Sequence, residues 1–331
     1  MAPAKSTSLV AGVDLGGTKV RAAVITTDGK VLGDSVLPTP AQNGPEAVVQ
    51  TIADAVRESC QRAWTVPAAL EAIGLAAAGL CDQKRGVVVY SPNLPGWDNF
   101  PVSERLFRRL ERPTFLDNDV NLAALAEQRF GAARGHRNVV YIAIGTGIGG
   151  AIIINGELHR GETGIAAEVG HMTVAPDGPP CACANRGCLE ALSSGSALAR
   201  EARLLLQRGV ASSLAELARG EDYTAITSEA IFAALAQSDA LAREVAEQGT
   251  YYLGTGLASL VNIFNPGLLI VGGGLADQWE DYIAPALRVM EQRVLPGMAR
   301  SLSVVPPALG SEAGVQGAAA YARERLMAKS R

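Results

Sequence analysis

One local pattern occurs twice in this chain and constrains its fold more than any other feature. In the first copy, the apolar strand Leu9–Asp14 runs into a glycine loop, a second strand and an Asp-Gly turn. In the second copy, the apolar strand Val139–Ile144 runs into Gly145–Gly150, a second strand and an Asn-Gly turn. Gly16 then matches Gly145, an offset of 129 residues. A strand, a glycine loop, a strand and a hairpin turn, repeated in this order, predict an α/β fold built by duplication.

Length and composition fit two folded domains. At about 100–200 residues per domain, a chain of 331 residues corresponds to two. Apolar residues make up 48% and charged residues 19%, which excludes a disordered chain. We expect a small N-terminal α/β domain at residues 1–118, joined by a C-terminal helix at 312–329. A large C-terminal α/β domain is expected at 119–311, and it contains the loop 171–190.

The charge and the apolar runs bear on the partners of the chain. A net charge of −4 and a pI near 5.6 lack the basic footprint of a nucleic-acid-binding protein. Two long uncharged runs, 138–156 and 248–276, are interrupted by turn-forming residues, and we interpret them as buried strands and helices rather than membrane spans. The N-terminus shows no pattern typical of a signal peptide. We therefore expect a cytoplasmic protein with neither nucleic acid nor a membrane as its partner.

Hydrophobic periodicity predicts the remaining elements. The expected helices are Glu46–Cys60, Val120–Phe130, Glu312–Ala328 and most of the chain from Gly195 to Phe264. The expected strands are Val20–Thr26, Val31–Leu37, Ala72–Ala78, Thr114–Leu116 and Leu268–Val271, and Ser91–Phe100 is expected to be a loop.

Glycine loops beside an acid are typical of phosphate binding. Glycines let backbone amides approach a phosphate closely, and Asp14 at the end of the first strand could hold a magnesium ion. A third glycine run, Gly272–Gly274, follows a buried strand and is expected to open a helix. Neither a leading G-x-G-x-x-G unit nor a Walker loop occurs, so the pattern favours a nucleotide clamped between two halves. For Gly16 and Gly17 alone an ordinary hairpin loop is the alternative, and Lys19 is either a phosphate contact or a solvated side chain.

Asp119 lies between a predicted strand and a predicted helix. One interpretation is that it caps the helix that begins at Val120. The other is that a carboxylate held rigidly at this junction accepts a proton from a substrate hydroxyl during phosphoryl transfer. The two roles do not exclude each other.

One histidine and three cysteines form a compact pattern with the spacing His-x9-Cys-x-Cys-x4-Cys. They are His171, Cys181, Cys183 and Cys188. Three thiolates and one imidazole satisfy the tetrahedral preference of zinc, and a site with four protein ligands is structural. The alternative is a chance cluster of inert thiols. A zinc-bound histidine keeps its second ring nitrogen available for a substrate hydroxyl.

Taken together, these motifs resemble the ROK family of sugar kinases and sugar-responsive repressors. The resemblance runs from about Val10 to the final helix. The segments that carry it are Asp14–Lys19, Ser91–Trp97, Asn118–Asn121, Gly145–Gly150, Glu168–His171 and Cys181–Glu190. The family implies an actin-like (ribonuclease H-like) duplicated α/β fold, with two domains around a cleft for a nucleotide and a sugar and with a zinc-bound loop.

The resemblance also implies roles for single residues. Asp119 matches the catalytic base of the family. The residues expected to contact the sugar are Asn93, Asn118, Asp119, Glu168, His171 and Glu190. The expected zinc ligands are His171, Cys181, Cys183 and Cys188. With the glycine-loop argument added, the residues expected to hold the nucleotide and its magnesium are Asp14, Gly16, Gly17, Thr18, Lys19, Thr146, Gly147, Gly272, Gly273 and Gly274.

The implied activity is transfer of phosphate from ATP to the 6-hydroxyl of a hexose, with glucose as the expected acceptor and with Mg²⁺ and a structural Zn²⁺. An N-acetylmannosamine kinase, a polyphosphate donor and a non-catalytic sugar-responsive regulator are the alternatives. A repressor needs a helix-turn-helix before the first strand, and eight residues, Met1–Ser8, precede it here. The family commonly forms dimers and sometimes tetramers, so a homodimer or homotetramer is expected.

Two positions depart from the family's pattern. Ala167 stands where the family usually has a glycine before the acid of its Glu-x-Gly-His motif, and Ala184 stands where it usually has a glycine after the second cysteine. An added methyl group matters there if the backbone needs a positive φ. The first departure bears on sugar preference, and the second bears on the zinc loop.

Overall fold

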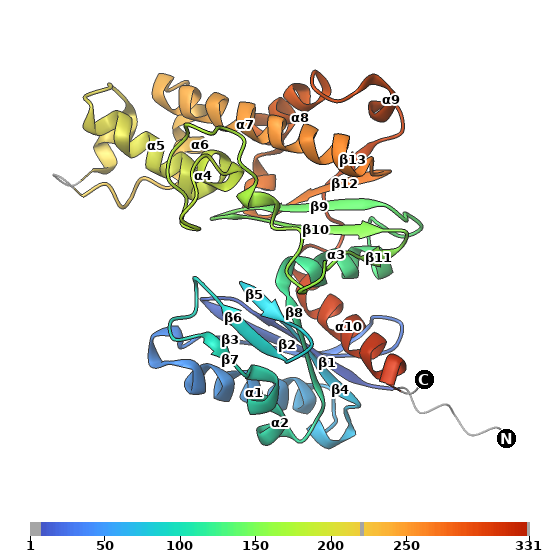
Figure 1. Ribbon diagram of the computed structural model, residues 1–331. Coiled ribbons are helices and arrows are strands. Elements are labelled where there is room, and N and C mark those ends of the chain that lie inside the picture. The colour runs from blue at the N-terminus through green and yellow to red at the C-terminus, as the bar shows by residue number, and fades with distance from the viewer. Residues whose placement is uncertain (1–7, 219–221, 330–331) are drawn as a thin grey trace. The chain divides into compact units, whose positions relative to one another are not determined.

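The computed structural model describes residues 8–218 and 222–329 of the chain. Contacts divide it into two compact units (Figure 1). The first unit consists of residues 1–135, 158–166 and 307–331, and the second of residues 136–157 and 167–306. The first unit thus extends past residue 118, and the domain boundaries drawn from the sequence stay a prediction.

The first unit contains a five-stranded sheet with the order β3-β2-β1-β4-β8. Its strands are β1 (Val10–Leu15), β2 (Lys19–Ile25), β3 (Val31–Pro38), β4 (Ala72–Ala77) and β8 (Thr114–Asn118). β1 is antiparallel to β2 and parallel to β4, and β4 is parallel to β8. A smaller sheet consists of β5 (Leu80–Asp82), β6 (Val87–Tyr90) and β7 (Asp98–Phe100).

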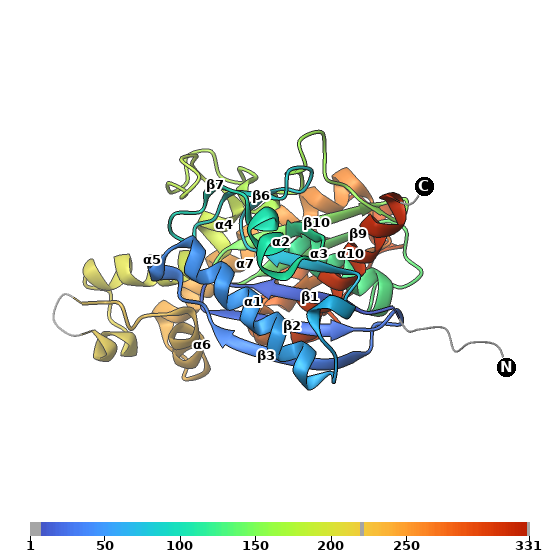
Figure 2. The ribbon, with the colours of Figure 1, turned by 90° about the horizontal axis from the view of Figure 1, so that it is seen from below.

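Helices cover both faces of the five-stranded sheet. Successive strand residues point to opposite faces, and in β1 and β4 the apolar residues on both faces are buried. The helices are α1 (Pro45–Arg62), α2 (Val102–Leu110), α3 (Asp119–Phe130) and α10 (Ala313–Lys329). Ala11 and Val13 of β1 pack with α1 and α2, whereas Val10 packs with α10. Figure 2 shows α1 in front of strands β1 to β3.

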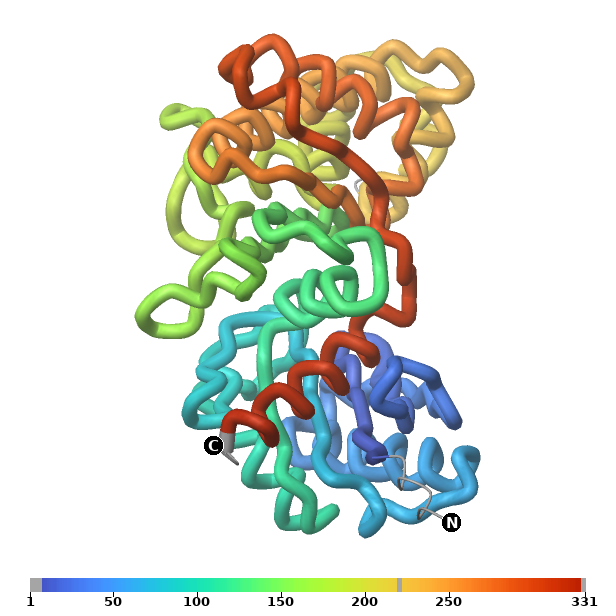
Figure 3. Tube along the Cα trace, turned by 90° about the vertical axis from the view of Figure 1, so that its right-hand side faces the viewer, coloured from blue at the N-terminus to red at the C-terminus, as the bar shows by residue number. Residues whose placement is uncertain are grey.

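The last helix, α10, lies directly on the sheet of the first unit and beside α3 (Figure 3). A Cβ atom at Gly12 of β1 would overlap the carbonyl group of Val315, and one at Gly74 of β4 would overlap that of Ala318. These two glycines therefore allow the helix backbone to touch the strand backbones. A helix from the C-terminal part of the sequence thus covers one face of the sheet formed by its N-terminal part.

The second unit repeats this plan with the sheet order β11-β10-β9-β12-β13. Its strands are β9 (Val139–Ile144), β10 (Ile148–Ile154), β11 (Glu157–Leu158), β12 (Leu268–Gly272) and β13 (Ser303–Val305). Its helices are α4 (Leu189–Ser193), α5 (Gly195–Gln207), α6 (Ser228–Ala236), α7 (Ala240–Phe264), α8 (Ala284–Glu291) and α9 (Pro296–Ala299). The core lies between the sheet and the buried face of α7.

The predicted duplication is confirmed in detail. Strands β9 and β10 begin and end 129 residues after β1 and β2, as the glycine loops do. In both units a hairpin forms one side of the sheet and two parallel strands extend the other. The pairing differs by one residue, since Val10 faces Ile25 whereas Val139 faces Ile153. The α/β fold class expected for the chain is therefore correct.

Two local expectations differ from the structure. The segment 91–100, expected to be a loop, ends in the short strand β7, which pairs with β6 and packs the Phe100 ring 5.0 Å from that of Trp97. The glycine run 272–274 opens a 3-10 turn, Gly274–Gln278, and then one π-helical turn before α8 begins. No helix in the described part of the chain is both long enough and apolar enough to cross a membrane.

Candidate functional site

Hydrogen bonds close the first glycine loop and attach it to Thr39. The Gly16 amide donates to the carbonyl of Lys19 at 3.0 Å, and the Thr39 hydroxyl donates to the carbonyl of Gly16 at 2.8 Å. Gly17 lies against the predicted sugar residue Asn93, because a Cβ built on Gly17 would be 3.0 Å from that of Asn93. The first unit thus brings a predicted phosphate loop and a predicted sugar residue together.

Asp14 is the next-to-last residue of β1, close to this loop in the sequence, and it is half-buried. Burial, and after it the negative charge of Asp119, raise the pKa of its carboxyl to about 6, although the positive charges of Lys19 and Arg21 act in the opposite direction. The charge of Asp119 disfavours ionisation of Asp14, and the charge of a divalent cation at Asp14 would offset this effect. The donor set is therefore suited to magnesium.

Replacing Asp14 should show what this carboxylate costs the fold. Folding raises the pKa of this carboxyl from near 4 to about 6. The folded protein therefore becomes less stable as the pH rises through this range, because the carboxyl is ionised more easily in the unfolded chain. Without added magnesium, Asp14→Asn should therefore gain about 2–3 kcal/mol in the free energy of unfolding at pH 8 and almost nothing at pH 4. Urea denaturation at the two pH values measures this. Asp98→Asn is the control, because that side chain is exposed; an equal gain at both pH values would contradict the argument.

The turn between β8 and α3 carries Asn118 and Asp119. The Asn118 side-chain oxygen accepts the amides of Val120 (2.9 Å) and Asn121 (3.2 Å), and its side-chain nitrogen donates to the carbonyl of Gly79 (3.1 Å). Asn118 is therefore the N-cap, and the expectation that Asp119 caps the helix is wrong: Asp119 is the first helical residue. Its side chain still accepts the Val120 amide at 2.9 Å.

The position of Asp119 suits a base. The side chain is fixed at a strand-to-helix junction by the cap beside it, and burial raises the pKa of its carboxyl. A carboxylate with a raised pKa is a better proton acceptor than an ordinary aspartate. Asn118 caps the helix, and its side chain also hydrogen-bonds the Asp119 carboxyl, which acts against the effect of burial on that pKa.

The second unit holds the second glycine loop. The Gly145 amide donates to the carbonyl of Gly147 at 2.9 Å, and the first residue of α5, Gly195, donates to the carbonyl of Gly145 at 2.7 Å. Glu190, expected to bind sugar, accepts the amide of Ile148 at 2.8 Å. Its carboxylate occupies the space that a Cβ at Gly147 would need. One acid thus fixes the shape of the loop that is expected to hold phosphate.

A cavity of about 480 Å³ opens beside this loop within the second unit. Thr146 and Gly274 line it, whereas Gly272 is the buried last residue of β12. The sequence analysis missed the other polar residues, which come from the starts of α5 and α6, from Arg203 farther along α5, and from Gln278 in the 3-10 turn after β12. Helix starts at Ser194 and Thr227, whose side chains cap these helices, were the available signal. Polar groups and helix N-termini around a glycine loop suit a nucleotide.

The four predicted metal ligands lie together in the second unit. Their ligand atoms are all within 4.8 Å of one another. The Cys181 sulfur is 3.6 Å from Nδ1 of His171, and the sulfurs of Cys183 and Cys188 are 3.7 Å apart. Zinc tetrahedra have S···S edges of roughly 3.8 Å and S···N edges of roughly 3.5 Å, given Zn–S near 2.3 Å and Zn–N near 2.0–2.1 Å. The donor set and its spacing therefore fit zinc, with Nδ1 as the ligand nitrogen.

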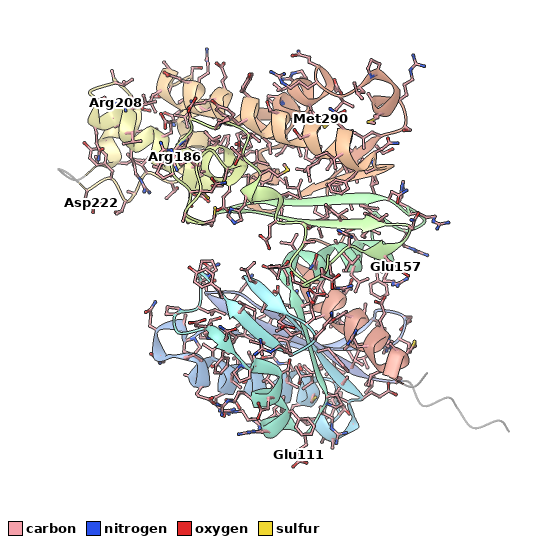
Figure 4. All side chains as sticks on the ribbon, in the orientation of Figure 1. Glu111, Glu157, Arg186, Arg208, Asp222 and Met290 are labelled. Atoms are coloured by element: carbon pink, nitrogen blue, oxygen red, sulfur yellow. The ribbon has the colours of Figure 1, made fainter. Side chains whose placement is uncertain are left out.

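Backbone pairing holds the ligands in this arrangement. Thr173 pairs with Cys188, and Pro180 pairs with Arg186, which Figure 4 labels in the loop. His171 belongs to a short 3-10 turn, Val169–His171, and its amide donates to the carbonyl of Glu168 at 3.0 Å. A metal at the four ligands would therefore fix the position of Glu168, the exposed acid expected to bind sugar.

Both departures from the family's glycines fall at positive φ. Ala167 has φ 70° and Ala184 has φ 69°, in the left-handed region that favours glycine. An alanine there costs about 1–2 kcal/mol. The strain adjoins Glu168 in one case and Cys183 in the other.

Glycine at Ala184 should stabilise the protein. Relief of strain outweighs the greater freedom of glycine in the unfolded chain, so Ala184→Gly should gain about 0.5–1 kcal/mol in unfolding free energy. Thermal unfolding of the metal-loaded protein measures the change. Ala182→Gly is the matched control: it is exposed in the same loop without a positive φ, and it should lose stability. A loss at both positions would mean that the left-handed strain is not relieved.

Comparison with known proteins places the chain. The model of the ROK family matches residues 10–325, and the chain belongs to this family. A glucokinase of Thermotoga maritima is 35% identical over 95% of this chain and 97% of its own, and a glucokinase of Streptomyces coelicolor is 37% identical over 96% and 98%. The structure of a ROK family glucokinase from Streptomyces griseus, in complex with glucose and AMPPNP, is 36% identical with a TM-score of 0.78, covering 96% of this chain and 100% of that one.

Proposed function

We propose that this protein is a glucokinase that transfers the terminal phosphate of ATP to the 6-hydroxyl of glucose. The observation that carries the proposal is Asp119, a half-buried carboxylate with a raised pKa at a fixed strand-to-helix junction. Glucokinases 35–37% identical along nearly the whole chain support the substrate pair, as does the related structure with glucose and AMPPNP. The proposed need for ATP and the free cysteines both favour the cytoplasm as the place of action.

Asp119 acts as the general base. The sugar's 6-oxygen forms a bond to the terminal phosphorus, the bond from that phosphorus to the bridging oxygen breaks, and ADP leaves. The hydroxyl proton moves to the Asp119 carboxylate, which later releases it to solvent. Positioning and electrostatics supply most of the rate in this kind of transfer. Asp14 would hold the magnesium ion, whose positive charge would offset that of the phosphates.

The other residues bind and orient. The residues that contact the sugar are Asn93, Asn118, Glu168, His171 and Glu190. The residues that contact the phosphates are Gly16, Gly17, Thr18, Lys19, Thr146, Gly147, Gly273 and Gly274. Thr146 and Gly274 line the cavity of the second unit, and Gly272, buried at the end of β12, positions the two glycines that follow it. His171, Cys181, Cys183 and Cys188 would hold a structural zinc ion. With Nδ1 of His171 as the ligand, Nε2 would remain available for a sugar hydroxyl.

The test is ADP release from magnesium-ATP with glucose and N-acetylmannosamine at equal concentrations. A clear preference for glucose supports the proposal. A preference for N-acetylmannosamine keeps the mechanism and overturns the substrate, and turnover only with polyphosphate overturns the donor. Bound sugar without turnover would move the function to a regulator. Sedimentation of the same sample tests the homodimer or homotetramer that we propose for it.

A further inference from the structure

Asp117, the residue before Asn118, is completely buried and forms an ion pair with Arg160. The reaction described above does not use it. Its Oδ1 accepts the backbone amide of Asn118 at 2.8 Å and the side-chain amides of Asn121 (3.1 Å) and Gln83 (3.2 Å). Its Oδ2 accepts Nε of Arg160 at 2.8 Å. A buried carboxylate is tolerated only with such a complete set of partners. Arg160 is the cation in that set.

Arg160 comes from a segment with an unusual place in the chain. Residues 158–166 belong by contacts to the first unit, although the residues on either side belong to the second. Three contacts hold this segment, which we call the strap, within the first unit. They are the ion pair with Asp117, the bond from Gln83 to the carbonyl of Gly164 at 2.7 Å, and the Arg160 guanidinium 5.1 Å from the centre of the Tyr321 ring in α10.

The strap leads directly to the proposed sugar residues. It ends at Ala166, whose amide donates to the carbonyl of Arg160 at 3.1 Å, and two residues later the chain reaches Glu168. Asp117, the partner of Arg160, also accepts the backbone amide of Asn118, which is the helix cap beside Asp119. One buried ion pair therefore touches both the turn that bears the base and the segment that leads into a sugar ligand.

We propose that Arg160 is a positioning residue, which ties the strap to the Asp117–Asp119 turn and so sets the placement of Glu168 for the sugar. The proposal rests on the proposed function. Arginine suits the task, because its planar group pairs with a carboxylate along one edge while its face lies on an aromatic ring. Lysine reproduces the charge without either geometry. A loss of about 1 Å in placement costs up to about 100-fold in rate.

The experiment separates positioning from simple stability with a pair of variants. Arg160→Met leaves a buried carboxylate unpaired, so it should lower the melting temperature and raise the KM for glucose about tenfold or more, with the KM for ATP little changed. In Arg160→Met with Asp117→Asn, no buried charge remains unpaired, so the melting temperature should recover. The KM for glucose should stay high in the double variant, because the tie is still missing. Arg160→Lys should restore part of the glucose KM.

The matched control is Arg129→Met, which removes an exposed arginine that pairs with Glu324 in the same unit. It should leave both KM values unchanged. If the glucose KM returns to normal in the double variant together with the melting temperature, the role of Arg160 is structural and the proposal fails. Hydrogen exchange of the amides of residues 158–166 gives a readout that needs no turnover: Arg160→Met should speed it, and unchanged exchange overturns the proposal. A wild-type protein without glucose turnover would instead refute the proposed function.

Discussion

Asp119→Asn should abolish turnover and leave the fold and the sugar affinity in place. The amide has the shape of the carboxylate but cannot take the proton of the 6-hydroxyl, and loss of a general base lowers rates by about 10²–10⁴-fold. We expect kcat to fall about 1,000-fold, with the dissociation constant for glucose changed by less than about threefold. Steady-state kinetics and titration calorimetry measure the two quantities on the same preparation.

The stability of this variant provides an internal check. Burial raises the pKa of Asp119, so the ionised form is disfavoured in the folded protein, and above that raised pKa the wild type bears the cost. Asp119→Asn should therefore melt at the same temperature as the wild type or higher at pH 8. Asp98→Asn, an exposed carboxyl in the same unit, should change neither rate nor affinity. If Asp119→Asn kept a tenth of the wild-type rate, another group would have to be the base.

Cys183→Ser should release the metal and destabilise the second unit. A serine hydroxyl is a poor replacement for a thiolate, and binding of structural zinc contributes about 10–16 kcal/mol in small zinc-binding peptides. We expect the zinc content to fall from about one ion per chain to a small fraction, and the melting temperature to drop by roughly 10 °C or more. The affinity for glucose should fall with it, because His171 loses its fixed orientation. Elemental analysis after dialysis and thermal unfolding give both results.

Cys60→Ala is the matched control for this experiment. Cys60 is buried in the first unit, and it does not belong to the group of four ligands. Its replacement should cost some packing energy without changing the zinc content. A full zinc complement in Cys183→Ser would remove the case for zinc at this site.

The sequence could predict those parts of the fold and site that depend on residues close together in the chain. The two hairpins were recognisable because strand, glycine loop and Asx-Gly turn are local signals, and they lie at the predicted spacing. The metal ligands were recognisable because Cys181, Cys183 and Cys188 lie within eight residues. The resemblance to a family marked Ala167 and Ala184, and both have the positive φ that makes an alanine costly.

The parts that could not be predicted depend on residues far apart in the chain. Asn118 and Asp119 are equally good caps by type, and the register of α3 decides between them. The cavity joins the second glycine loop to the starts of α5 and α6, and no local pattern connects them. Asp117 and Arg160 are 43 residues apart, and only the folded unit shows that they pair.

The interrupted course of the first unit has a consequence for how the protein is made. Translation delivers β1 and β4 early, whereas α10, the helix that packs on Gly12 and Gly74 of these strands, is made only after the residues of the second unit. The second unit, residues 136–157 and 167–306, is therefore completely synthesised while the sheet of the first unit still lacks this helix. A nascent chain stalled before Ala313 should therefore hold a protease-resistant second unit and a protease-sensitive first one. Until α10 is made, the apolar surface that it covers stays exposed on the nascent chain, where such surface favours aggregation.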